Sequence, residues 1–227
     1  MGRRRGAILI KHAEHDMAHS NAAAGLFAAS IIAIGGPSAL AADPANPDWP
    51  CIQRKVATLT SAQMWDGPVV DDLTGWRNNE EMTKLIAVLV SRRVPIEQAA
   101  AAIAQFAAAQ PQGKRDEALK LLFAGLLSTI NNDRAAVMDG IERFQRRQKA
   151  RAAEIERQGA ELRQLKERAA NDENARVALT AAEDKYNWDV RVFTERQQSL
   201  PLACEVPVVI EQRLFELARE IRTHMNE

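Results

Sequence analysis

Apolar residues recur every three or four positions through most of the chain, which is the spacing of one face of an α-helix. The pattern predicts three helices over residues 77–132. The first is capped by Asn78 or Asn79, the second opens at Pro95, and the third ends near Ile130. The first helix carries its apolar repeat at Met82, Leu85, Ile86, Leu89 and Val90. We expect these three helices to form one packing unit.

Residues 133–171 are rich in Arg, Glu, Gln and Ala, and residues 133–200 predict two long helices joined by a polar turn at residues 171–174. A short turn between long helices favours an antiparallel hairpin. The first of these helices follows a heptad, with its two core positions at Ile141, Gln148, Ile155, Leu162, Ala169 and at Phe144, Arg151, Gln158, Leu165. Several of these residues are polar, so we expect part of each helix to face water or another chain.

Residues 201–227 predict a last helix that packs back on the bundle. We expect Pro201 to end the hairpin, Cys204 to lie in a loop and Pro207 to start the helix. No stretch alternates between apolar and polar residues for long enough to predict a strand. The fold class expected from the sequence is therefore all-α: a helical bundle with a long, coiled-coil-like antiparallel hairpin.

The chain before residue 77 lacks this periodicity. Residues 42–76 predict an irregular N-terminal segment with one short helix, which the capping-box residues Thr60 and Gln63 open. Residues 1–41 have the order of a secretory signal peptide, namely a basic start, an apolar run at residues 22–34 and small residues before a cut at Ala42. We therefore expect a periplasmic or secreted protein.

Two points about this leader stay open. Translation can start at Met1 or at Met17, because the stretch between them is unusually polar for a leader. An uncleaved membrane anchor is the alternative to a cleaved signal peptide, and it is the one case in which we expect contact with a membrane.

Removing residues 1–41 also changes the charge and the available chemistry. The segment carries four of the 30 Lys and Arg and two of the 30 Asp and Glu, which leaves 26 basic and 28 acidic residues. A near-neutral chain gives no electrostatic reason to expect nucleic acid as a partner. His224 is then the single remaining histidine. A Ser-His-Asp or Cys-His site is accordingly not expected, nor is a His- and Cys-ligated metal, and no motif predicts a cofactor.

The two cysteines, Cys51 and Cys204, both lie after the predicted cut. An even pair in an exported chain predicts a structural disulfide. A reactive thiol pair is the alternative, but the Cys-x-x-Cys spacing that would favour it is absent.

A cluster of aromatic and acidic residues between Trp65 and Glu81 is the strongest candidate for chemistry. Glycosidases use two carboxylates across a cleft that aromatic rings often line. A catalytic or glycan-binding role would use Asp71, Asp72 and Glu80 with Trp65 and Trp76. The structural alternative is favoured: acidic residues are common in turns and at helix starts, and tryptophans fill the core of a small domain.

Trp188, on the second long helix, lies off the apolar repeat of the hairpin. It could bind a partner, but packing against the N-terminal segment is favoured. The leading functional hypothesis is a non-enzymatic interaction protein whose hairpin binds another envelope protein or a second copy. The alternative is a carboxylate-dependent glycan hydrolase or glycan-binding protein. A weaker option is a pocket for a lipid or quinone-like molecule between the alanine-rich helix that opens at Pro95 and its neighbours.

Overall fold

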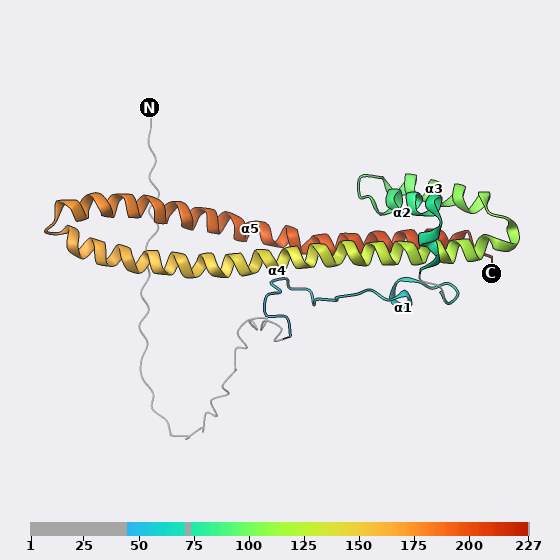
Figure 1. Ribbon diagram of the computed structural model, residues 1–227, viewed down its shortest axis with the longest axis horizontal. Coiled ribbons are helices and arrows are strands. Elements are labelled where there is room, and N and C mark those ends of the chain that lie inside the picture. The colour runs from blue at the N-terminus through green and yellow to red at the C-terminus, as the bar shows by residue number, and fades with distance from the viewer. Residues whose placement is uncertain (1–44, 71–73, 227) are drawn as a thin grey trace, which may run out of the picture. The chain divides into compact units, whose positions relative to one another are not determined.

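The computed structural model describes residues 45–70 and 74–226, and within these ranges the chain is all-α with no strand. The predicted signal peptide at residues 1–41 lies outside the described residues. Two helices are far longer than the others and lie side by side in opposite directions (Figure 1). The elements are α1 Ser61–Met64, η1 Gly75–Asn78 (a 3-10 helix), α2 Glu80–Val90, α3 Ile96–Ala109, η2 Gln112–Lys114 (a second 3-10 helix), α4 Arg115–Ala169 and α5 Glu173–Thr223.

The helix starts predicted at Thr60, Asn79 and Pro95 are confirmed, whereas the start predicted at Pro207 is wrong because this residue lies inside α5. The side chain of Asn79 accepts a hydrogen bond from the backbone N–H of Met82 at 3.0 Å and caps α2. In the same way, Asp172 caps α5 by accepting from the backbone N–H of Asn174 at 2.9 Å. At α1, the Gln63 side chain accepts from the backbone N–H of Thr60 at 2.9 Å. Such bonds satisfy backbone donors that have no partner inside the helix.

Two predicted helix ends are wrong. The helix expected to stop near Ile130 continues as α4 to Ala169, so the packing unit and the hairpin share one helix. Residues 115–169 contain no proline, and nothing in that stretch forces the backbone out of the helical conformation.

The second wrong end is at Pro201, where α5 continues through both Pro201 and Pro207. A proline inside a helix removes one backbone hydrogen bond and strains the preceding turn. Here tertiary contacts outweigh that cost, because Cys204, Pro207 and Ile210 are all buried. The final helix is therefore the end of the hairpin itself, and Cys204 lies within a helix instead of a loop.

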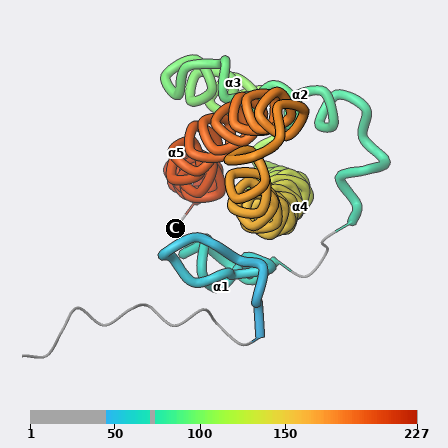
Figure 2. The backbone as a smooth tube through the Cα atoms, turned by 90° about the vertical axis from the view of Figure 1, so that its left-hand side faces the viewer, coloured from blue at the N-terminus to red at the C-terminus, as the bar shows by residue number. Residues whose placement is uncertain are grey.

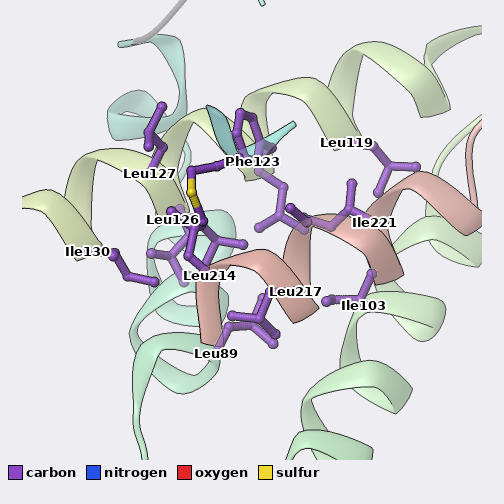
Figure 3. Close-up of a cluster of buried hydrophobic side chains, with 14 of the residues drawn as sticks. Leu89, Ile103, Leu119, Phe123, Leu126, Leu127, Ile130, Leu214, Leu217 and Ile221 are labelled. Atoms are coloured by element: carbon purple, nitrogen blue, oxygen red, sulfur yellow. The ribbon is translucent and has the colours of Figure 1, made fainter. Parts of the chain in front are cut away.

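The main core lies where α2 and α3 cover one side of the α4–α5 pair, opposite the N-terminal segment (Figures 1 and 2). Eleven large side chains are fully buried, and each stabilises the fold by about 1.5–3 kcal/mol relative to exposure. Figure 3 labels ten of the core residues: Leu89, Ile103, Leu119, Phe123, Leu126, Leu127, Ile130, Leu214, Leu217 and Ile221.

The N-terminal strap, as we call residues 45–70, runs along α4 and α5 with one turn and one short helix. Its backbone is fixed at Leu59, whose N–H donates to Asn131 Oδ1 and whose carbonyl accepts from Asn131 Nδ2, both at 2.9 Å. Nearer its start, Asp48 forms an ion pair with Lys149 at 2.9 Å. The irregular segment is thus held by specific side chains of α4, since an irregular backbone must find its hydrogen bonds outside itself.

Candidate functional site

Trp65 and Trp76 both pack on the core through α4. The ring of Trp65 stacks on Phe123, with 4.5 Å between centroids and 20° between the planes. Trp76 lies beside Gly125, where a Cβ atom would come within 3.0 Å of its ring. Both rings are partly buried against the main core. These contacts indicate that Trp65 and Trp76 are structural residues, which hold the strap and η1 against α4.

The acidic residues of this region that the structure describes, Asp66, Glu80 and Glu81, are exposed and do not gather in a buried cleft. Glu80 is 82% exposed and pairs with Lys84 on the next turn of α2 at 2.7 Å. Asp66 and Glu81 are exposed, and Asp71 and Asp72 lie outside the described residues. Glu80 and Glu81 lie in the first turn of α2, where exposed carboxylates stabilise the helix. The glycan-directed alternative stays a prediction.

The predicted disulfide is present. Cys51 Sγ and Cys204 Sγ lie 1.99 Å apart, and the bond joins the strap to α5 across 153 positions of sequence. Next to it, the side-chain amide of Gln53 donates to the backbone carbonyl of Cys204. A small second apolar cluster surrounds the bond and includes Trp49, Met138 and Ile141. The strap is consequently bound covalently and by packing at the same place.

Two polar residues of the heptad seam, Gln148 and Gln158, lie inside the hairpin. Gln148 is 2% and Gln158 7% exposed, so the expectation that such residues face water or another chain is wrong for these two. Gln148 Nε2 donates to the Phe193 carbonyl of α5 at 3.4 Å. A buried polar group is tolerated when a partner is available, and the facing helix supplies one here.

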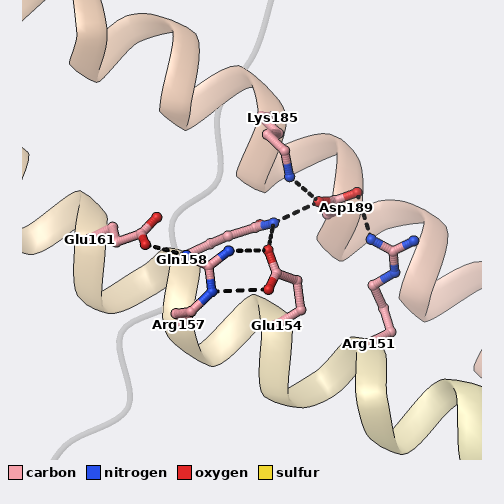
Figure 4. A network of polar contacts seen from close by, with 7 residues as sticks. All are labelled: Arg151, Glu154, Arg157, Gln158, Glu161, Lys185 and Asp189. Carbon is pink, nitrogen blue, oxygen red and sulfur yellow. Dashed lines mark hydrogen bonds and ion pairs between the residues drawn. The ribbon is translucent and has the colours of Figure 1, made fainter.

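Asp189 of α5 is at the centre of a polar network that connects the two helices of the hairpin (Figure 4). Its carboxylate accepts from Lys185 Nζ at 2.8 Å and from Gln158 Nε2 at 2.9 Å, and it lies 3.5 Å from the guanidinium of Arg151. The hydrogen bonds from Lys185 and Gln158 lower the pKa of Asp189 below its ordinary value. The remaining members are Glu154, Arg157 and Glu161. The network therefore favours a single register between α4 and α5.

Trp188 is 59% exposed, so the favoured prediction that it packs against the N-terminal segment is wrong. The guanidinium of Arg191 lies over its ring at 4.4 Å from the centroid. Because the side chain is off the apolar repeat of α5, it points away from the seam. Of the four tryptophans, this one alone is not used to pack the strap or the core.

Arg134 is a residue that the sequence analysis did not single out. It lies on α4 with only 3% of its surface exposed, beneath the strap. The sequence does indicate that Arg134 is buried, because it falls between Ile130 and Met138 in the apolar repeat of α4. A charged side chain at a core position indicates a specific partner.

Searches against known proteins add no functional information: no protein-family model, curated protein or solved structure matches this chain. In the described part of the chain, no group of three or more His, Cys, Asp or Glu side chains could hold a metal ion. No helix of residues 45–70 and 74–226 combines the length and the apolar character needed to cross a membrane.

Proposed function

We propose that this chain is an exported, non-enzymatic interaction protein that binds its partner through the hairpin arm, which we define as residues 145–198 of α4 and α5. The partner is another envelope protein or a second copy of the chain. The Cys51–Cys204 disulfide is compatible with an oxidising compartment, which supports export.

The observation that carries the proposal is the exposed pair of Trp188 and Arg191 on the arm. Tryptophan and arginine are the residue types most enriched among interface residues that dominate binding energy. Inside the seam of the arm, the side chains of the two helices already bind one another, as the hydrogen bond from Gln158 Nε2 to Asp189 shows. Recognition is therefore assigned to the outer surface of α5.

Partner capture at residue 188 tests this proposal directly. A photo-crosslinking amino acid at position 188, in the full chain in its own cell envelope, should give a discrete cross-linked product. Trp188→Ala should weaken the isolated complex at least about tenfold, as expected for a dominant interface residue. Analytical ultracentrifugation of the purified chain identifies the case in which the partner is a second copy.

Thr194 provides the matched control, since it is an exposed residue of the same helix. Thr194→Ala should leave the complex unchanged. The proposal fails if the chain sediments as a monomer and position 188 yields no cross-link. It also fails if Trp188→Ala and Thr194→Ala bind alike.

A further inference from the structure

An apolar groove lies between α4 and α5 at the base of the hairpin arm. Its walls are apolar side chains of the two helices: Val137, Ile141 and Phe144 of α4, with Leu200, Ala203 and Val206 of α5. The volume of the groove is about 430 Å³, and it is open to solvent on one side. Phe144 and Leu200 are only partly buried here. The core of the protein therefore reaches the surface at this place without a covering element among the described residues.

The groove continues the surface on which α2 is packed. α2 contacts both α4 and α5, and α2 and α3 lie over the pair only near the end where the chain terminates (Figure 1). A smaller pocket at the end of α2 is lined by Val90 and Val137, and Val137 also lines the groove. An apolar stripe between two helices is normally buried by a third element. The groove is thus the next, open stretch of an interface that α2 already uses.

Gly140 lowers the wall of the groove on α4. Over Gly125 of the same helix, the space is filled by Ile86 of α2 and by Trp76. Over Gly140, a Cβ atom would meet its nearest neighbour, on Arg143, only at 3.9 Å. Glycine disfavours a helix interior. At Gly140 it leaves room for another helix to approach α4 closely, as Gly125 leaves room for Ile86.

The groove lies on the same side of α5 as Trp188. Ser199, at the rim of the groove, follows Trp188 by 11 positions, which is close to three turns of about 3.6 residues each. Arg147 is the one charged side chain among the described residues that line the groove, and it forms no ion pair with them. A polypeptide that lies in the groove can therefore also reach Trp188, and it is favoured if it places a negative charge beside Arg147.

We propose that the groove binds an amphipathic helix of the partner, with its apolar face against Phe144 and Leu200 and an acidic residue beside Arg147. Helices that bind in apolar grooves use side chains spaced by three or four positions. The groove extends along α4 from Val137 to Arg147, so about three turns of helix, or about 15 Å, cover it. This inference rests on the proposed function, because it names the element with which the partner at Trp188 binds.

The helix comes from a different protein. The shorter helices of this chain, α2 and α3, are already packed into its own main core. The seam of the arm is likewise closed by contacts between α4 and α5. A second copy would have to give up one of these contacts to supply the helix, whereas another envelope protein would not.

Photo-crosslinking at position 199 tests the inference. The full chain carries the cross-linking amino acid in place of Ser199, in its own cell envelope, and the cross-linked peptide is sequenced by mass spectrometry. We expect a segment of another protein with an amphipathic helical repeat and an acidic residue. A synthetic peptide of that segment should bind the purified, disulfide-bonded chain one to one and should gain helical circular dichroism on binding.

Gly140→Leu should weaken the binding of this peptide at least about tenfold, because the larger side chain fills the groove while leucine favours the helix. Ala153→Leu is the matched control and should bind normally, since Ala153 is an exposed residue of α4 that does not line the groove. Arg147→Glu should weaken binding about threefold, as expected when an exposed attraction becomes a repulsion. Because Arg147 is exposed, this variant keeps the test valid if Gly140→Leu fails to fold.

The inference and the proposed function fail separately. A cross-link at position 188 without one at position 199 overturns the inference and leaves the proposed function in place. A monomeric chain without a cross-link at either position overturns both. The inference is also overturned if the cross-linked peptide belongs to a second copy or lacks a helical repeat, if Gly140→Leu and Ala153→Leu bind alike, or if Arg147→Glu binds unchanged.

Discussion

Gly125 shows how a single hydrogen atom in place of a side chain decides the packing of this core. It lies on α4 and is buried beneath Ile86 and Trp76. Glycine is normally unfavourable in a helix interior, at about 1 kcal/mol relative to alanine. Its presence at this position is explained by the close approach of the two side chains, because a methyl group would overlap Cδ1 of Ile86 and crowd the Trp76 ring.

Gly125→Ala should therefore destabilise the protein by about 1–3 kcal/mol through overpacking. Gly140 on the same helix is the matched control, because a Cβ there would meet its nearest atom, on Arg143, at 3.9 Å. Gly140→Ala should stabilise the protein by up to about 1 kcal/mol through helix propensity. Urea unfolding of the two variants measures both effects, and equal midpoints would contradict the packing argument.

At the scale of the helix, boundaries set by local chemistry were predictable. Asn79 starts α2 because a cap acts on its own first turn, and the polar residues 171–174 form the predicted turn between α4 and α5. The expected stop at Pro201 fails because packing of α5 on α4, which lies far away in the sequence, outweighs the local cost of proline. For the same reason, the seam was predictable from heptads, but the partners of Gln158 were not, since Asp189 belongs to the other helix.

The Asp189 network makes the stability of the hairpin depend on pH. The pKa of Asp189 is lowered in the folded chain, so its contribution is present above the ordinary pKa of 3.8 and is lost as the pH falls through the lower folded value. The stability difference between the unmodified chain and Asp189→Asn should thus shrink as the pH falls below about 4. Urea unfolding followed by circular dichroism at about pH 6, 4 and 3 measures it.

Lys185→Gln removes the hydrogen bond that lowers this pKa most. In that background, the effect of Asp189→Asn and its dependence on pH should both be smaller. If the stability difference between the unmodified chain and the Asp189→Asn variant stayed constant over the same pH range, the carboxylate charge would not be what stabilises the hairpin.

At the scale of the molecule, the strap connects parts of the fold that the sequence analysis treated separately. One segment reaches the core through Trp65 on Phe123, and the start of the arm through Asp48 on Lys149. The pairing of Cys51 with Cys204 was predictable by elimination, since the chain has two cysteines. The route of the strap was not predictable, because the path of an irregular backbone depends on hydrogen-bond donors and acceptors of helices that lie far away in the sequence.

Reduction of the disulfide should lower the free energy of unfolding by about 5 kcal/mol, the value that chain entropy gives for a loop of 153 positions. It should also expose Trp49, which is 8% exposed in the intact protein, and so shift the tryptophan fluorescence of the protein to longer wavelength. Urea unfolding with and without reductant measures the loss. The Cys51→Ser, Cys204→Ser double variant is the control and should not respond to reductant.

The position of the disulfide also determines how the molecule carries mechanical load. The arm lies entirely between Cys51 and Cys204, within the covalent loop that their bond closes. Tension applied through residues before Cys51 and after Cys204 passes across the sulfur–sulfur bond and bypasses α4 and the arm. A partner held by Trp188 would therefore remain on an unstretched support while the two ends of the chain were pulled.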